Sequence, residues 1–356
     1  MCHPSLISPE TRFLTLDAAV ELESGDCLDG VTVAYRTWGR LNSERDNAVL
    51  VCHALTGSAD ADEWWPGLFG AGKTLDLDRD FVICSNVLGS CYGTTGPTSP
   101  KPGRTESYGP DFPDVTVRDM VKVQRLLLDA LGVQWLHLVI GGSLGGMQAL
   151  EWAASAPERI GAAVVIATCG RHSPWCIALS EAQRAAIRAD TAWQEGRYSP
   201  CRPPGRGLAA ARMMAMCTYR TPGNFGDRFG RDLNPNGEFE SESYLRHHGN
   251  KLVQRFDANA YIVLTRAMDS HDLGRGRGAY HDVLGKIGSP VLVVAITSDL
   301  LYPPEEQHEL ARWMPGARLA ELFSNHGHDG FLIDTEALDR HVRAFRSTPV
   351  RRRLAC

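Results

Sequence analysis

One stretch decides the fold: residues 136–148 read Leu-His-Leu-Val-Ile-Gly-Gly-Ser-Leu-Gly-Gly-Met-Gln. A short apolar run rich in β-branched residues leads into glycines around Ser143, and a helical pattern begins after Gly146. This order predicts a strand, a tight turn and a helix, and residues 141–145 fit the G-x-S-x-G pattern of a nucleophile elbow. Glycines on both sides of Ser143 would let strand and helix approach closely enough to hold the serine in a strained turn.

Working outward from this stretch, apolar runs alternate with helical patterns. Such alternation indicates a parallel sheet with helices on both faces. The pattern stops after the strand that follows the elbow, and no convincing strand returns for more than a hundred residues, which indicates a helical insertion. We therefore divide the chain into a first core part (1–170), an inserted helical lid (171–285) and a last core part (286–356).

The individual elements follow from periodicity and turn residues. Residues 12–40 read as antiparallel strands at a sheet edge. The predicted buried strands are 47–53, 81–87, 136–140, 161–168 and 290–296, with a further strand near 317–322. The predicted helices are 119–131, 177–188, 207–217, 240–256, 259–268, 305–314 and 335–345.

Composition excludes several functional classes. The chain has 356 residues, 43% of them hydrophobic and 22% charged, and a net charge of −5, which does not suggest binding to nucleic acid or to an anionic membrane. No apolar run is long enough to span a membrane, and the N-terminus lacks the features of a signal peptide. The ten cysteines form no Cys-x-x-Cys pair, so we expect neither a zinc ribbon nor a disulfide scaffold, but a reduced, cytoplasmic protein.

A serine nucleophile needs a base and a group that orients the base. In proteins with a nucleophile elbow, these residues follow one another along the chain in the order serine, acid, histidine. Asp299 follows the predicted strand 290–296, in the position of the acid. His326 and His328 both lie in the last loop before the C-terminal helix, and we favour His328 because it directly precedes an apolar segment, with His326 as the alternative. Two histidines could also suggest a metal site, but no carboxylate or thiol stands at ligand spacing.

The oxyanion formed in acyl transfer needs two N–H donors. Leu144, the residue after the nucleophile, should supply one. The other should come from the loop after the strand ending at His53, where Leu55 is our first choice and Thr56 the second. His53 itself is better explained as a buried, hydrogen-bonded histidine than as the base.

A second motif is misleading. Residues 67–74 read Gly-Leu-Phe-Gly-Ala-Gly-Lys-Thr, a literal Walker A string. A true phosphate-binding loop follows a strand and opens a helix. Here Trp-Trp-Pro precedes the string and too few residues for a helix follow it, so we reject nucleotide binding.

Several further segments, together with the elbow and the His328 loop, resemble the sequences of one protein family. They are residues 53–57 (HALTG), 81–89 (FVICSNVLG), 91–93 (CYG), 95–97 (TGP), 141–152 (GGSLGGMQALEW), 255–261 (RFDANAY) and 327–332 (GHDGFL). With these segments the chain resembles the homoserine O-acetyltransferase family along nearly its whole length. The resemblance implies an α/β-hydrolase fold and an acyltransferase of methionine biosynthesis, with no metal or bound cofactor and with acetyl-CoA as co-substrate.

The resemblance also implies roles for individual residues. Ser143 would be acylated in a ping-pong reaction, His328 would shuttle protons and Asp299 would orient His328. Arg212, in a lid segment at 207–213, would meet the carboxylate of the amino acid. Asp329 would meet its ammonium group, and Tyr219 would line the same pocket. A homodimer formed through the helical lid is implied as well.

The sequence departs from the family pattern at some positions. Leu144 stands where methionine is expected, and Ala215-Met216 where Gly-His is expected. Arg202 and Arg206 add basic charge before the lid segment and could pair with a succinyl carboxylate. We expect acetyl-CoA and L-homoserine as substrates, with a succinyl donor or a serine acceptor as alternatives, a serine esterase as the main rival and a non-catalytic binding protein as the third possibility. Arg212 and Asp329 favour the transferase, because a zwitterionic acceptor needs both charges matched.

Overall fold

The computed structural model describes residues 7–347. Its centre is an eight-stranded sheet in the order β1-β4-β6-β5-β7-β8-β9-β10, in which the pairs β1–β4 and β4–β6 are antiparallel and the other pairs are parallel. The predicted antiparallel edge and the parallel centre are therefore both confirmed. The strands are β1 (Arg12–Thr15), β4 (Thr32–Trp38), β5 (Ala48–Cys52), β6 (Phe81–Ser85), β7 (Leu138–Gly142), β8 (Ala163–Ile166), β9 (Val291–Ile296) and β10 (Ala317–Leu322), with β2 (Val20–Glu21) and β3 (Cys27–Leu28) in a separate ribbon.

The strand order changes direction at β5, and this change positions the site. β6 lies on one side of β5 and β7 on the other, with Cys52 paired to Gly141. In open α/β sheets, ligand sites form where the carboxyl ends of strands meet such a reversal. The loop after β5 and the loop after β7, which contains Ser143, are therefore neighbours.

Helices cover both faces of the sheet, as the continuous apolar strands require. Apolar side chains of α2, α3, α9 and α10 pack on one face, and those of α1 and α12 on the other. Helix α2 begins at Val117 rather than at Asp119, because Thr116 caps the helix and receives a hydrogen bond from the Asp119 backbone amide. These helices are α1 (Ala61–Trp64), α2 (Val117–Ala130), α3 (Leu144–Ser155), α9 (Tyr280–Gly285), α10 (Pro304–Trp313) and α12 (Thr335–Arg346), and the short α11 (Gly330–Ile333) precedes α12.

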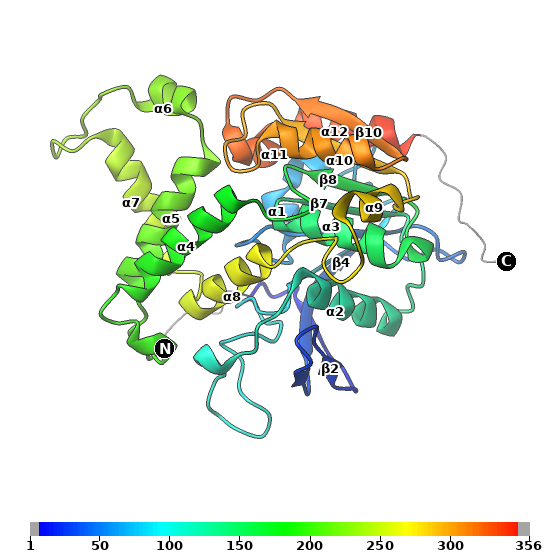
Figure 1. The fold of residues 1–356 in the computed structure, drawn as a ribbon, viewed down its shortest axis with the longest axis horizontal. Helices are drawn as coiled ribbons and strands as arrows, with labels where there is room; N and C mark the ends of the chain where they lie inside the picture. The colour runs from blue at the N-terminus through cyan, green and yellow to red at the C-terminus, as the bar shows by residue number, and fades with distance from the viewer. Residues whose placement is uncertain (1–6, 348–356) are drawn as a thin grey trace.

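The helical segment 171–285 lies beside the sheet, and in Figure 1 helices α4 to α7 gather on one side of it. The segment shares a large apolar cluster with the rest of the chain, in which Leu208 and Tyr261 join Leu88 and Met147. Met216, Phe229 and Tyr244 form a small cluster of their own. The helices are α4 (Pro174–Arg188), α5 (Gly205–Tyr219), α6 (Pro222–Phe229), α7 (Glu240–Val253) and α8 (Ala258–Asp269), of which α6, like α9, was not predicted.

The Walker-like string forms no phosphate loop. Its first two residues belong to a 3₁₀ turn at Pro66–Leu68, and the string leads directly toward β6. The Thr74 amide donates to Asp339 Oδ1 at 2.7 Å, and Lys73 Nζ lies 3.8 Å from Asp339 Oδ2. A carboxylate of the chain itself thus faces the groups that would hold a phosphate, which agrees with the rejection of nucleotide binding.

Between residues 7 and 347, seven cysteines are free, and several of them, including Cys52 and Cys84, are buried in strands. Cys201 is disulfide-bonded, so the expectation of a fully reduced chain is wrong at that position. The spacing of scattered cysteines carries no information about such a pairing. Between residues 7 and 347, no helix combines the length and the hydrophobicity that crossing a membrane requires.

Candidate active site

Ser143 occupies a strained turn between β7 and α3. Its backbone has φ 58° and ψ −125°, a conformation that non-glycine residues rarely adopt. The turn is fixed on both sides, because the Ser143 amide donates to Ile166 O at 2.9 Å and Thr168 Oγ1 donates to Ser143 O at 2.8 Å. These two hydrogen bonds hold the backbone of Ser143 at the end of the sheet and do not involve its side chain.

The glycines of the elbow are required by close approach. A Cβ atom at Gly141 would lie 2.3 Å from Gly145 O, and one at Gly145 would lie 2.1 Å from Cys52 O. Any side chain at either position would push helix α3 away from the sheet. The structure thus gives a physical reason for the elbow prediction.

Asp299 and His328 form a buried pair. His328 Nδ1 lies 2.7 Å from Asp299 Oδ2, and the other oxygen, Oδ1, accepts hydrogen bonds from the amides of Leu301 at 2.8 Å and Tyr302 at 3.0 Å. Since the carboxylate can only accept, Nδ1 carries the proton and Nε2 is left free to act as a base. Burial lowers the pKa of His328, but the charge and the hydrogen bond of Asp299 outweigh it, so the pKa is raised above 6.5.

Tyr302 supports this pair in a way that the sequence did not suggest. Its ring lies 5.3 Å from the His328 ring, and its hydroxyl lies 3.1 Å from Nε2 of the buried His172. The other nitrogen of His172 faces Asp269 at 3.1 Å. A polar chain therefore links the helical segment to the loop that holds Asp299.

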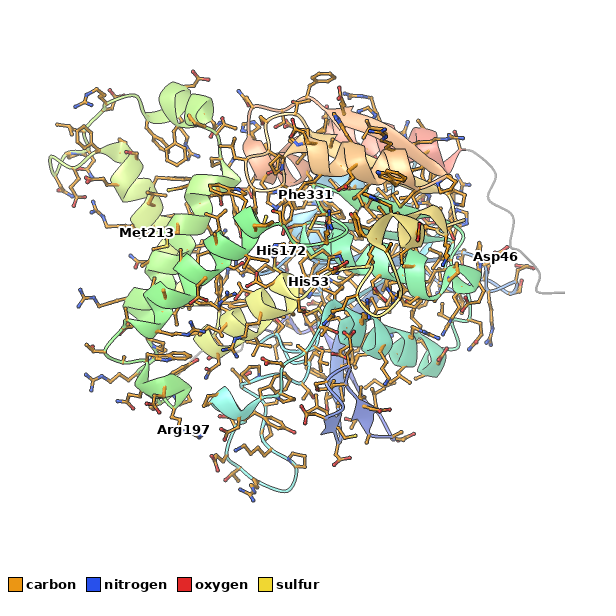
Figure 2. All side chains as sticks on the ribbon, viewed as in Figure 1. Asp46, His53, His172, Arg197, Met213 and Phe331 are labelled. Atoms are coloured by element: carbon orange, nitrogen blue, oxygen red, sulfur yellow. The ribbon has the colours of Figure 1, made fainter. Side chains whose placement is uncertain are left out.

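Ser143 and His328 line the same cavity of about 520 Å³, between the carboxyl ends of the strands and the helical segment. In the view of Figure 2, His53 and Phe331 lie near the centre of the molecule, and Met213 of α5 lies farther out. Except for Leu144 and Asp299, every residue predicted for the site contributes to the cavity wall. These wall residues are Leu55, Ser143, Arg212, Tyr219, His328 and Asp329.

The residues predicted as oxyanion donors lie at the start of α3 and in the cavity wall. Leu144 opens helix α3, so its N–H has no acceptor within the helix. Leu55 lies in the wall of the cavity, and so does Thr56, whose carbonyl and hydroxyl both accept hydrogen bonds from Arg255. Which of the two N–H groups joins that of Leu144 stays a prediction.

His53 is the buried, hydrogen-bonded residue that we expected. Its Nε2 accepts from the Val87 amide at 3.1 Å, and its Nδ1 donates to Ala54 O at 2.8 Å. Burial lowers its pKa to about 4. Neither nitrogen is left to serve as a base.

His326, the alternative base, points elsewhere. Its Nδ1 lies 3.2 Å from Asn224 Nδ2 of helix α6, and the residue does not line the cavity. Of the two histidines in this loop, only His328 therefore lines the cavity that contains Ser143.

The charged groups of the cavity partly differ from expectation. Arg212 lies over the Tyr219 ring at 5.1 Å, and that ring lies 5.6 Å from the His328 ring. Asp329 is not alone, because Arg220 Nη2 lies 3.2 Å from its Oδ2. The sequence had not singled out Arg220.

Two further cations reach the cavity, Lys251 and Arg255. Arg255 Nη1 donates to Thr56 O at 2.7 Å and to the Tyr92 hydroxyl at 2.6 Å. Arg202 and Arg206, by contrast, are exposed and do not line the cavity, so the idea that they would pair with a succinyl group there is wrong. Arg202 lies before α5 and Arg206 in its first turn.

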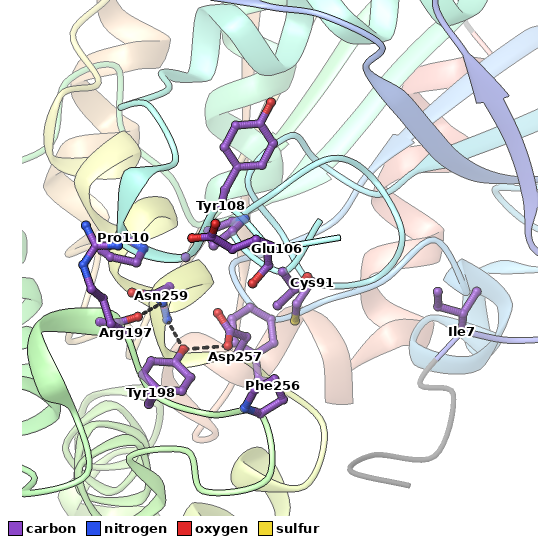
Figure 3. A pocket seen from close by; sticks show the side chains of 16 residues that line it. Ile7, Cys91, Glu106, Tyr108, Pro110, Arg197, Tyr198, Phe256, Asp257 and Asn259 are labelled. Atoms are coloured by element: carbon purple, nitrogen blue, oxygen red, sulfur yellow. Dashed lines mark hydrogen bonds between the residues drawn. The ribbon is translucent and has the colours of Figure 1, made fainter. Parts of the chain in front are cut away.

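A second cavity of about 520 Å³ lies apart from Ser143 and His328. Figure 3 shows the Tyr198 hydroxyl between Asp257 and the Asn259 backbone, with hydrogen bonds of 2.6 and 2.9 Å. The described residues that line this cavity include no histidine that could activate a nucleophile. We therefore place the chemistry in the first cavity. Within residues 7–347, no three His, Cys, Asp or Glu side chains are grouped so that they could hold a metal ion.

Comparison with known proteins agrees with this geometry. Residues 47–335 match the family model described as the alpha/beta hydrolase fold. A homoserine O-acetyltransferase of Chlorobaculum tepidum is 59% identical over 97% of both chains. The crystal structure of a homoserine O-acetyltransferase from Bacillus anthracis superposes with a TM-score of 0.90 at 26% identity, covering 96% of this chain and 98% of that one. Esterase E22 superposes with a TM-score of 0.88 at 29% identity, covering 95% and 99%. The chain belongs to the homoserine O-acetyltransferase family, acyltransferases built on the α/β-hydrolase fold.

Proposed function

We propose that this enzyme transfers the acetyl group of acetyl-CoA to the hydroxyl of L-homoserine, for methionine biosynthesis. The observation that carries the proposal is the presence of Arg212 and Asp329 in the wall of the cavity that contains Ser143. A cation and an anion at one end of the site match the carboxylate and the ammonium of an amino acid. The 59% identity to a homoserine O-acetyltransferase supports the same acceptor and donor.

In the first half-reaction, Ser143 Oγ attacks the thioester carbonyl carbon while His328 Nε2 takes the hydroxyl proton. Asp299 holds the imidazole in the required tautomer and stabilises its positive charge. The oxyanion is stabilised by the Leu144 amide and by the amide of Leu55 or Thr56. When the carbon–sulfur bond breaks, the imidazolium gives its proton to the sulfur, coenzyme A leaves as a thiol, and acetyl-Ser143 remains.

In the second half-reaction, the homoserine hydroxyl attacks acetyl-Ser143 while His328 takes its proton. The tetrahedral intermediate collapses, the Ser143 oxygen recovers a proton from His328, and O-acetyl-L-homoserine leaves. Arg212 binds the carboxylate of the acceptor and Asp329 its ammonium, which fixes the hydroxyl near the ester carbon. Tyr219, between Arg212 and His328, forms the wall of this subsite.

A succinyl donor and a serine acceptor are the two alternative substrates. Lys251 and Arg255 add positive charge to the cavity, which suits a succinyl carboxylate as well as the phosphates of coenzyme A. Serine is shorter than homoserine by one methylene and carries the same two charges. Rates of thiol release with acetyl-CoA and succinyl-CoA, and with each amino acid, decide among these.

Hydrolysis is the second candidate function, and the structural similarity to esterase E22 favours it. Water would replace homoserine in the second half-reaction. The presence of both Arg212 and Asp329 in the cavity wall argues for the transferase, because a zwitterionic acceptor uses both charges and a simple ester uses neither.

The deciding experiment measures free thiol released from acetyl-CoA, with and without L-homoserine, beside a Ser143→Ala control. Release that requires homoserine and disappears in the control supports the transferase. Release at an equal rate without any amino acid would instead make the protein a hydrolase.

We further propose a cytoplasmic homodimer that contacts no membrane or nucleic acid. Met214, Leu233 and Phe239 of the helical segment are exposed apolar side chains, as a dimer interface through this segment requires. Sedimentation of the purified protein tests the dimer.

A further inference from the structure

The end of helix α5 lies directly against the loop that carries His328. A Cβ atom at Gly327 would lie 2.9 Å from Tyr219 O and 3.0 Å from the carbonyl carbon of Arg220. Thr221 Oγ1 donates to Asn325 O at 3.0 Å. The helical segment and the base-carrying loop therefore meet through backbone contacts at this point.

Arg220 makes one ionic contact there, with Asp329. Its Nη2 lies 3.2 Å from Asp329 Oδ2, and the two side chains are only 13% and 14% exposed. Arg220 Nε is buried and has no hydrogen-bond acceptor within residues 7–347. A buried guanidinium needs a compensating partner, and here the partner is Asp329.

The two residues differ in their relation to the cavity. Asp329 lines it, together with Arg212 and His328, whereas Arg220 does not. The ion pair engages Oδ2 of Asp329, and no side chain or backbone group of residues 7–347 forms a hydrogen bond with Oδ1. Arg220 therefore does not contact a ligand in this cavity directly, and Asp329 is the residue that connects it to one.

The charged groups that face Asp329 are Arg220, Arg212, His328 and Asp299. Burial raises the pKa of Asp329, and Arg220 makes the largest opposing contribution, followed by Arg212 and His328. Without Arg220 the carboxyl group would be protonated over a wider pH range. A protonated carboxyl group offers no charge to an ammonium ion.

We propose that Arg220 is a positioning residue for the amino acid acceptor, keeping Asp329 ionised and oriented so that its free oxygen binds the acceptor's ammonium group. The inference rests on the proposed transfer to an amino acid. Under this proposal, the ion pair between Arg220 of the helical segment and Asp329 of the His328 loop makes the enzyme prefer an amino acid over a neutral alcohol.

The test compares Arg220→Met and Arg220→Lys with a matched control, Arg246→Met. Arg246 pairs with Glu238 at 2.8 Å, on a half-exposed surface away from the cavity. For each variant we would measure KM for homoserine, kcat, and the rate of the coenzyme A burst without acceptor. In Arg220→Met we expect KM for homoserine to rise about tenfold or more, with a much smaller loss in the burst, and a smaller rise in Arg220→Lys.

Two further measurements separate positioning from a purely structural role. In Arg220→Met, KM should fall as the pH is raised, because Asp329 then ionises only at higher pH. In an Asp329→Asn background, Arg220→Met should add little to KM, since the residue through which it acts is gone.

Two results would contradict the role proposed for Arg220. Equal losses in the burst and in homoserine-dependent turnover, or effects of Arg220→Met and Asp329→Asn that multiply, would mean that Arg220 only supports the loop, and the proposal fails. If Arg220→Met does not fold, as judged by circular dichroism, Arg220→Lys and the Asp329→Asn background decide. Failure of the proposed function is seen separately, in the wild-type protein, as thiol release that ignores homoserine.

Discussion

Two loops at the carboxyl ends of strands each place a buried histidine beside the cavity, but the surroundings shift the pKa values of the two histidines in opposite directions. His53, after β5, is surrounded by backbone groups, and its pKa falls to about 4. His328, after β10, faces the carboxylate of Asp299, and its pKa rises above 6.5. The exposed fractions are 0% and 3%, so burial does not distinguish the two residues.

The comparison shows that the hydrogen-bond partner of a histidine, and not how deeply the side chain is buried, determines whether it can act as a base. Backbone groups on both nitrogens fix His53 as a neutral structural group, because Val87 already donates to Nε2. A carboxylate on one nitrogen leaves the other free and stabilises the charge that develops during proton transfer. Substitutions at the two loops should therefore have different kinds of effect.

The largest effect is expected from His328→Ala. Removing the base should lower kcat for homoserine-dependent thiol release on the order of 10⁶-fold, as for other triad bases. Stopped-flow and endpoint thiol assays with acetyl-CoA measure it, with circular dichroism to verify folding. Activity within tenfold of wild type would show that another group takes the Ser143 proton, and the contrast between the loops would then be meaningless.

Asp299→Asn should have the next largest effect. The rate should fall about 10⁴-fold, because an amide does not hold the imidazole in the right tautomer or stabilise its charge. The sign of the pH effect follows from the pKa of His328. That base works when neutral, so kcat/KM of the wild type falls as the pH drops through a pKa above 6.5. Without the Asp299 carboxylate, burial lowers the pKa of His328 against only the smaller opposing effect of Asp329, so the acidic limb of the residual activity should move to lower pH.

A pH profile of the residual activity, measured at high enzyme concentration, tests this shift. If the acidic limb stays where it was, the raised pKa does not come from Asp299.

The contrast also explains what the sequence could predict. Ser143 and its glycines were found because an elbow is a local arrangement, enforced by contacts such as that between Gly145 and Cys52 O. Asp299 and His328 were found because they follow predicted strands in a known order. Arg220 and Tyr302 were missed because their roles depend on contacts between distant segments, which leave no periodic pattern. Helix α6 was missed for a different reason, since its eight residues begin with Pro222 and include two glycines, which is a composition typical of loops.

His53 should matter for stability rather than for catalysis. The unfolded chain binds a proton at His53 near pH 6.5, whereas the folded chain does so only near pH 4. The free energy of unfolding should therefore fall as the pH drops between these values, by about 2 kcal/mol from this residue at pH 5. Urea unfolding of wild type and His53→Gln at pH 7 and pH 5 measures it. Other groups titrate in both proteins, so the difference between the two pH dependences isolates His53.

In His53→Gln the loss of stability between pH 7 and pH 5 should be smaller than in the wild type, although the variant itself is less stable at pH 7. Identical pH dependences in the two proteins would mean that His53 is not held neutral in the folded state.

The smallest effect is expected from His326→Ala, which separates the two histidines of one loop. His326 contacts Asn224 of α6 rather than Asp299, and it does not line the cavity. A surface substitution of this kind changes free energies by no more than about 0.5 kcal/mol, so kcat should stay within about twofold of wild type. Thiol release under saturating homoserine measures it, beside His328→Ala. A loss comparable to that of His328→Ala would assign the base to His326, and would mean that the loop turns its other histidine toward Ser143 during the reaction. A change only in KM for homoserine would instead place the Asn224 contact among those that hold the helical segment against the site.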